Sequence, residues 1–207
     1  MTNRMTSLFL ACCLVSVATQ AQGRYVAASK YDRQNSNEDG KEVDIAGVGK
    51  IKIPDLVLRD QEGRRVRFYS DLIKDKIVVL TFFYTSCTYS CTMQGRTFSK
   101  LQSLLGKRLG KSVFLISVTT DPVRDTPEKL KSWATHYNVQ PGWTLVTGDQ
   151  TEMNKLLIPF TGNGAGGGMH LPAIFIGNEK EGLWTSASGV FAPEDLLRVV
   201  DVITTRK

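Results

Sequence analysis

The sequence predicts an α/β domain in which helices cover both faces of a central mixed sheet. Three observations carry this prediction. Strand-like and helix-like segments alternate along most of the chain. The run Lys76–Tyr84 (KIVVLTFFY) is continuously apolar, β-branched and aromatic, which is typical of a strand buried on both faces. Two short strand-like segments near the C-terminus predict a hairpin, which would add an antiparallel edge to a parallel sheet.

Regular structure is expected to begin near Ile45, ahead of the buried strand. Two strands are predicted at Ile51–Leu58 and Arg64–Phe68, because turn-forming residues at 60–63 separate two apolar segments. A single helical turn is expected at Ser70–Leu72. The two strands would lie on either side of the turn at 60–63.

The elements after the buried strand follow from helical spacing, capping signals and further apolar runs. Thr126 suits a helix N-cap, Pro127 suits the first helical position, and Glu128 favours the positive end of the helix dipole. The predicted elements are, in order, a helix at Cys91–Leu105, a strand at Ser112–Val118, a helix from Pro127 to about Tyr137, a strand at Thr144–Val146, a helix at Asp149–Phe160, the hairpin Ala173–Ile176 with Gly182–Ser186, and a helix at Pro193–Ile203.

Length and charge exclude some classes of protein. A chain of 207 residues is about one domain, and its 42% hydrophobic residues can bury a single core. The formal charge is +6, but basic and acidic residues alternate, and no Lys/Arg cluster is interleaved with aromatics. We therefore expect no nucleic-acid partner.

The N-terminus has the pattern of a signal peptide over residues 1–21. Arg4 is followed by an apolar stretch at 8–18 and by small residues near a cleavage point. The stretch is shorter than the roughly 20 residues that span a bilayer. We expect export with cleavage, and an uncleaved anchor is the alternative. Residues 22–44 are polar and predict a flexible tether, which leaves 45–207 as the folded domain.

Export would leave two cysteines in the mature chain, Cys87 and Cys91, because Cys12 and Cys13 lie in the signal. The pair follows the predicted buried strand and reaches the start of the next helix, where ligands and reactive groups gather in α/β sheets. Unpaired N–H groups and the helix dipole would stabilise a thiolate there. The C-x-x-x-C spacing suits an ion as well as a bridge, so a metal site, thiol–disulfide exchange and a passive disulfide all stay open.

Four segments resemble the Sco/SenC family: TFFYTSCTYSC (81–91), ISVTTDPVRDTPEKLKSWA (116–134), GMHLPAIFIG (168–177) and PDLVLRDQEGRRVRFYSDL (54–72). The resemblance covers residues 51–207. It implies a thioredoxin-like three-layer fold with an N-terminal β-hairpin. It also implies a place in the periplasm or on the outer face of the inner membrane, tethered or peripheral at most.

The same resemblance implies a function. Family members bind copper through two cysteines and one distant histidine, here Cys87, Cys91 and His170, and help deliver it to the binuclear copper site of cytochrome c oxidase. The resemblance thus implies Cu(I) or Cu(II) as the ion, and as partner the copper-site subunit of the oxidase or another copper or thiol protein of the envelope. Two thiolates and an imidazole suit copper, particularly Cu(I), and also zinc. Three protein ligands leave a site more open than the four of structural zinc, which suits handing an ion on. The resemblance also places Asp121 near the copper, although both it and Asp125 could merely shape a turn and cap a helix.

Two departures from the family pattern favour thiol–disulfide exchange as the alternative function. Thr88 and Thr92 stand where the family often has proline, and each keeps an N–H that could point at a sulfur. Pro172 stands where thioredoxin-like oxidoreductases place a proline beside their thiols. In that enzyme, Cys87 would attack a disulfide and Cys91 would resolve the mixed disulfide.

Overall fold

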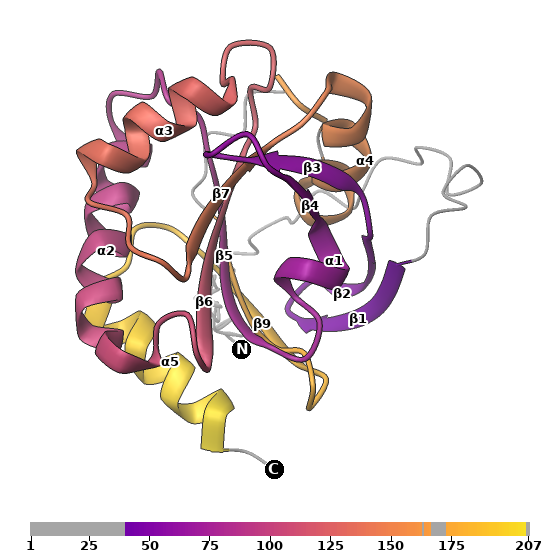
Figure 1. Cartoon of the computed structure of the whole chain (residues 1–207). Coiled ribbons are helices and arrows are strands. Elements are labelled where there is room, and N and C mark those ends of the chain that lie inside the picture. The colour runs from indigo at the N-terminus through magenta and orange to yellow at the C-terminus, as the bar shows by residue number, and fades with distance from the viewer. Residues whose placement is uncertain (1–39, 163, 167–172, 206–207) are drawn as a thin grey trace, which may run out of the picture.

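The computed structural model describes residues 40–162, 164–166 and 173–205, which form a nine-stranded mixed sheet with helices on both faces (Figure 1). The strands are β1 (Gly40–Ala46), β2 (Gly49–Pro54), β3 (Val57–Asp60), β4 (Arg65–Arg67), β5 (Ile77–Phe83), β6 (Val113–Thr119), β7 (Trp143–Thr147), β8 (Ala173–Asn178) and β9 (Leu183–Ser188). The helices are α1 (Phe68–Leu72), α2 (Ser90–Leu105), α3 (Pro127–His136), α4 (Gln150–Thr161) and α5 (Pro193–Thr205), with a 3₁₀ turn at Gly106–Arg108. The predicted α/β class is confirmed.

The sheet has the order β2-β1-β9-β8-β5-β6-β7-β3-β4. Strands β5, β6 and β7 are parallel and form its centre. Strand β8 runs antiparallel to β5, and β9 antiparallel to β8. On the other side, β3 and β4 form an antiparallel hairpin attached to β7.

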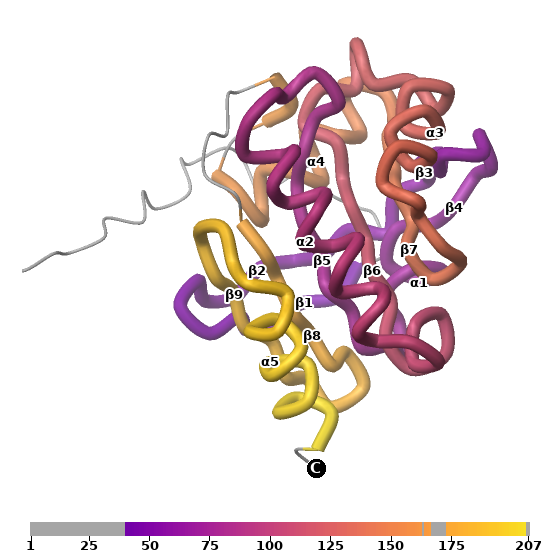
Figure 2. Tube along the Cα trace, turned by 90° about the vertical axis from the view of Figure 1, so that its left-hand side faces the viewer, coloured from indigo at the N-terminus to yellow at the C-terminus, as the bar shows by residue number. Residues whose placement is uncertain are grey.

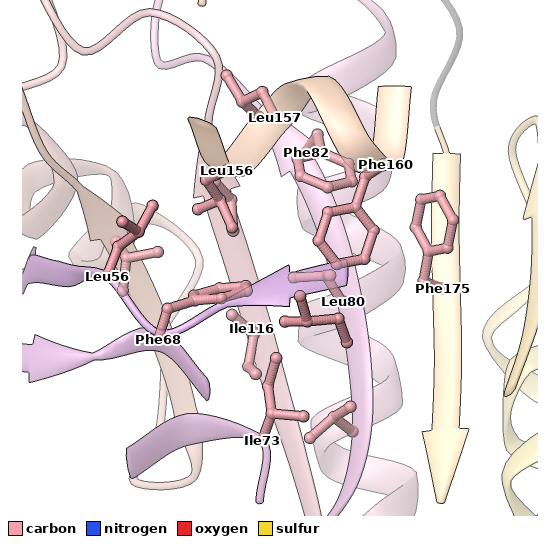
Figure 3. Close-up of a cluster of buried hydrophobic side chains, with 14 of the residues drawn as sticks. Leu56, Phe68, Ile73, Leu80, Phe82, Ile116, Leu156, Leu157, Phe160 and Phe175 are labelled. Atoms are coloured by element: carbon pink, nitrogen blue, oxygen red, sulfur yellow. The ribbon is translucent and has the colours of Figure 1, made fainter. Parts of the chain in front are cut away.

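Each buried strand divides its side chains between two hydrophobic cores. In β5, Val78, Leu80 and Phe82 face the layer that contains α1 and α4, whereas Val79 and Phe83 face α2, α3 and α5. Figure 1 shows α2, α3 and α5 to the left of the central strands, and Figure 2 looks onto the face of the sheet that these helices cover. Figure 3 shows the other core, where Phe82, Phe160 and Phe175 meet with ring centroids 5.1–5.9 Å apart. A strand covered on both faces explains the uninterrupted apolar run.

Two predictions about the N-terminal part are wrong. Regular structure was expected to begin near Ile45, but the first described residues, from Gly40 on, already form β1, which pairs with β2 and also, in parallel, with β9. The predicted strand Ile51–Leu58 is two strands. Pro54 ends β2, and β3 begins at Val57. Between them, the carboxylate of Asp55 accepts the backbone N–H groups of Tyr69 and Ser70 over 3.1 and 2.8 Å, in the first turn of α1.

The late hairpin is also placed differently from the prediction. It is not an edge of the sheet, because β8 lies between β5 and β9, and β9 in turn pairs with β1. The first residue of β8, Ala173, therefore lies next to the central strand that leads to the cysteines. The other elements match their predicted segments within three residues at either end.

Candidate functional site

The two cysteines lie where the central strand β5 gives way to helix α2. A turn joins them to the strand, because the backbone N–H of Cys87 donates to the carbonyl of Tyr84 over 3.2 Å. Cys91 is the second residue of α2 and is 6% exposed, whereas Cys87 is partly exposed just ahead of the helix. Both are free thiols. The predicted juxtaposition of the pair at a strand end and a helix start is found in the structure.

The sulfur of Cys87 is an acceptor at the N-terminus of α2. The backbone N–H of Cys91 donates to it over 3.3 Å, and the Ser90 hydroxyl lies 3.6 Å from it. Because the first amides of a helix have no partner within the helix, this sulfur satisfies one of them. Thr92, which stands where the family often has proline, donates its hydroxyl to the Cys87 carbonyl over 3.3 Å.

These contacts separate the two thiols chemically. Partial burial works to raise the pKa of Cys87, but hydrogen bonds from the thiol and N–H of Cys91, the Ser90 hydroxyl and the Tyr89 N–H lower it to about 7. Burial, assisted by the hydrogen bond to Cys87, raises the pKa of Cys91 to about 12. A hydrogen bond to Cys87 also raises the pKa of Tyr84. Near neutral pH, Cys87 is therefore partly ionised, whereas Cys91 keeps its proton.

A hollow of about 440 Å³ opens onto Cys87. Its walls come from the turn after β5 and from the loop between β9 and α5, and the lining residues are Tyr84, Cys87, Thr88, Tyr89, Ser90, Gly189 and Val190. Tyr89 is 77% exposed and Val190 is 48% exposed, so both project at the rim. Cys91 does not line the hollow. A partner in the hollow would therefore meet Cys87 first.

The two aspartates have different partners. The carboxylate of Asp121 pairs with the Arg124 guanidinium over 2.5 Å, and its place beside a metal stays a prediction. Asp125 was expected to cap α3, and that is wrong. Its fully buried carboxylate accepts hydrogen bonds from Thr85 and Thr119, while Thr126 occupies the N-cap position, although its side chain makes no capping hydrogen bond to the helix backbone. Asp125 thereby contacts the turn from Tyr84 to Cys87, which we call the cysteine turn. No sequence signal predicts this contact, because Thr85 lies 40 residues from Asp125.

His170 and Pro172 lie outside the described residues, so their predicted roles remain predictions. The chain on either side of them is anchored near β5. The N–H of Gly166 donates to the carbonyl of Thr120 over 2.7 Å, and the Thr120 N–H donates to the carbonyl of Phe83 over 2.8 Å. The hydroxyl of Thr81 donates to the carbonyl of Ala173 over 3.3 Å.

Within residues 40–162, 164–166 and 173–205, no three His, Cys, Asp or Glu side chains gather in a way that could hold a metal ion. The described part of the site thus offers two sulfur donors. In the same part of the chain, no helix is both long enough and apolar enough to cross a bilayer.

Comparison with known proteins places these features in a family. The model of the SCO1/SenC family matches residues 50–163. A putative copper-binding protein of Stutzerimonas stutzeri is 30% identical over 107 residues, which cover 50% of this chain and 49% of that protein. The SCO1 protein homolog of Bacillus subtilis (strain 168) is 27% identical over 109 residues, or 52% of this chain and 55% of that protein. The matches span about half the length of these curated relatives.

Solved structures show the same fold. BsSco, described as a member of the Sco family of cytochrome c oxidase assembly proteins, matches with a TM-score of 0.61 at 21% identity, covering 82% of this chain and 98% of that one. Copper-bound ScoI of Bradyrhizobium japonicum matches with a TM-score of 0.56 at 22% identity, covering 71% and 96%. These likenesses confirm the thioredoxin-like fold. Since the family model covers more than half of its residues, the chain belongs to the SCO1/SenC family.

Proposed function

We propose that the protein binds one copper ion through Cys87, Cys91 and His170 and passes it to the binuclear copper site of a cytochrome c oxidase. The observation that carries the proposal is the state of the dithiol. Two free sulfurs sit at the start of α2, and one of them is partly exposed with a pKa of about 7. The copper-binding description of the Stutzerimonas stutzeri relative supports the choice of metal.

The donor set fits Cu(I). Thiolates are soft ligands that select Cu(I), and imidazole also suits copper. Binding would release the proton of Cys91, because the raised pKa of this thiol keeps it protonated until the ion arrives. The hollow beside Cys87 leaves one side of the site accessible to an acceptor protein. Cys87 is partly exposed and Cys91 is buried, so the pair could hold an ion and still release it to an acceptor.

Strand pairing supports His170 as the third ligand. Strand β8 runs antiparallel to β5, and Ile174 lies opposite Thr81. The N-terminal end of β8, at Ala173, therefore lies beside the C-terminal end of β5, which leads to Cys87. Ala173 is three residues from His170, a length of chain that reaches at most about 10 Å. A short length of chain therefore separates His170 from β8, which pairs with β5, the strand that leads to the dithiol.

The cellular setting belongs to the same proposal. A signal peptide at residues 1–21 would export the chain, and the polar segment that follows would leave the domain peripheral to the membrane or tethered to it. An acceptor in the periplasm or on the outer face of the inner membrane would then be within reach.

Anaerobic titration with Cu(I) against a chromogenic chelator tests the ligand set. The reduced protein should take up one equivalent, and His170→Ala should raise the dissociation constant by at least about tenfold, which is about 1.4 kcal/mol. The matched control is His136→Ala, because His136 is exposed at the end of α3 with its ring on Tyr137. Equal affinities for the two variants would remove His170 from the ligand set. Failure to bind copper at all would overturn the proposal.

The difference between the two thiols favours one second candidate, thiol–disulfide exchange. The thiolate of Cys87 would attack a partner disulfide and expel one partner thiolate, which takes up a proton. Cys91 would then lose its proton and attack the sulfur of Cys87, which expels the second partner thiolate. The partner would gain two electrons, and the protein would end with a Cys87–Cys91 disulfide.

The Cys91→Ser variant distinguishes this activity from copper delivery. If exchange is the function, this variant should accumulate a mixed disulfide at Cys87 with oxidised glutathione, and His170→Ala should leave the exchange rate unchanged. A dithiol that reacts with neither copper nor disulfides would contradict both functions.

A further inference from the structure

A buried carboxylate joins the cysteine turn to the neighbouring strand. Asp125 is 0% exposed. One of its oxygens accepts the Thr85 hydroxyl over 2.5 Å, and the other accepts the Thr85 backbone N–H over 3.0 Å and the Thr119 hydroxyl over 2.5 Å. Thr85 comes two residues before Cys87, and Thr119 is the last residue of β6.

The contacts of Asp125 converge on the turn that carries Cys87. That turn is closed by the bond from the Cys87 N–H to the Tyr84 carbonyl, and Thr85 is its second residue. On the other side, the Thr119 hydroxyl oxygen accepts the N–H of Asp121 over 3.0 Å. The carboxylate therefore links the end of β5, the end of β6 and the turn that precedes α3.

From this arrangement we propose that Asp125 is a positioning residue for the dithiol, fixing the sulfur of Cys87 against the first amides of α2. Cys91 is held by its helix and by the core. The 3.3 Å contact between the Cys91 N–H and the Cys87 sulfur therefore depends on where the turn places Cys87. The carboxylate of Asp125 holds that turn because it accepts hydrogen bonds from both the backbone N–H and the hydroxyl of Thr85. The proposal rests on Cys87 being the accessible sulfur of the proposed function.

The chemistry at position 125 requires a carboxylate. Three donors converge on it, and an ionised carboxylate is an acceptor at both oxygens. An asparagine of the same shape would turn an NH₂ group towards at least one of these donors. Among the described residues, Asp125 is hydrogen-bonded only by neutral groups. Burying a carboxylate is costly unless hydrogen bonds compensate, so each of these three donors matters.

Asp60 provides a matched control. It is 1% exposed, and its carboxylate also holds a turn, accepting the N–H groups of Glu62 and Arg64 over 2.9 Å each. That turn joins β3 to β4, away from the dithiol. Asp60→Asn therefore removes a buried turn-holding carboxylate without touching the cysteine turn.

The experiment compares Asp125→Asn, Thr85→Val, Thr85→Ser and Asp60→Asn in the full chain. Hydrogen exchange of the Cys91 amide is measured by NMR relative to the Leu115 amide, which donates to Gly142 within the core. Alkylation of Cys87 by iodoacetamide at pH 7 is followed by mass spectrometry of the peptide that contains it. Cu(I) affinity is measured by chelator competition.

Asp125→Asn and Thr85→Val should speed exchange of the Cys91 amide by about tenfold relative to Leu115. They should slow alkylation of Cys87 by about threefold or more, because the sulfur loses hydrogen bonds that favour the thiolate. Cu(I) should bind about tenfold more weakly, because the two sulfurs are less well positioned. Thr85→Ser keeps the N–H and the hydroxyl and should behave as the wild type.

Asp60→Asn should lower stability and leave all three measurements at the dithiol unchanged. If Asp125→Asn does the same, Asp125 only stabilises the fold and the inference is overturned. If Asp125→Asn does not fold, Thr85→Val decides in its place. A wild-type protein that binds no copper would refute the proposed function, while exchange and alkylation would still test Asp125.

Discussion

The backbone N–H of Cys91 donates to the sulfur of Cys87 across 3.3 Å, so one cysteine is held at the helix terminus by the amide of the other. The residue that supplies this amide is itself buried. The pair is thus built asymmetrically, with one sulfur at the wall of a hollow and one inside the core. The first two predictions follow from this asymmetry.

The two thiols should react over different pH ranges. Because the pKa of Cys87 is lowered to about 7, its thiolate fraction rises through neutral pH and should level off at a pH where an ordinary cysteine, with a pKa of about 8.5, is still mostly protonated. The pKa of Cys91 is raised to about 12, so this thiol should stay unreactive in the folded protein across the same range. Rates of iodoacetamide alkylation at each cysteine between pH 5 and 10 would check this. A midpoint near 8.5 for Cys87 would contradict it.

Removing the Ser90 hydroxyl should raise the pKa of Cys87. The hydroxyl lies 3.6 Å from the sulfur and stabilises its charged form. A hydrogen bond of about 0.5–1.5 kcal/mol corresponds to a rise of roughly half a unit to one unit. The pH profile of Ser90→Ala should therefore shift towards higher pH, which slows alkylation at pH 7. Ser103→Ala is the control, since this exposed serine on α2 donates to the Ser99 carbonyl. Equal profiles for the two variants would show that Ser90 has no effect on the thiolate.

Gly95→Ala should destabilise the protein, although alanine favours a helix interior by about 1 kcal/mol over glycine. A Cβ at position 95 would lie 2.6 Å from the ring of Tyr137 and 2.9 Å from that of Trp133. These rings are packed together with centroids 4.2 Å apart, so they have little room to move. We expect a net loss of about 1–3 kcal/mol in the free energy of unfolding, measured by urea denaturation. A gain in stability would mean that the aromatic layer yields easily.

A double-mutant cycle should reveal coupling between Gln94 and Thr81. The Gln94 side chain is buried and donates to the Thr81 hydroxyl, which in turn donates to the carbonyl of Ala173. Gln94→Leu and Thr81→Val should each cost about 1–3 kcal/mol, because each leaves a buried polar group without its partner. The double variant should cost less than the sum of the two. Additive costs in urea denaturation would argue against the link between α2 and β5.

The sequence predicts the central strands well because the residues of each strand themselves form the apolar run that indicates burial. Strand β5 was expected at Lys76–Tyr84 and is found at Ile77–Phe83, since a strand covered on both faces needs an unbroken apolar run. Helix α2 begins one residue before the predicted Cys91. The dithiol could therefore be located from the sequence, including its place at a helix start.

What the sequence did not predict depends on contacts between distant segments. Strand β1 was taken for part of a tether, because only Val43 and Ile45 of its seven residues are buried. Its parallel partner, β9, lies about 140 residues further along the chain. Asp125 was taken for a helix cap, because the Asp-Thr-Pro-Glu sequence around it resembles a helix start. Its true partners, Thr85 and Thr119, become neighbours only once β5 and β6 pair.

The order of the sheet also has a consequence for self-association. Its outermost described strands, β2 and β4, carry exposed Lys50 and Lys52 on one margin and exposed Arg65 and Arg67 on the other. Charged side chains along an edge strand disfavour pairing with a second molecule, and β4 offers only three residues to pair with. Both margins thus discourage fibre growth and leave encounters with other proteins to the rest of the surface, where the hollow beside Cys87 opens.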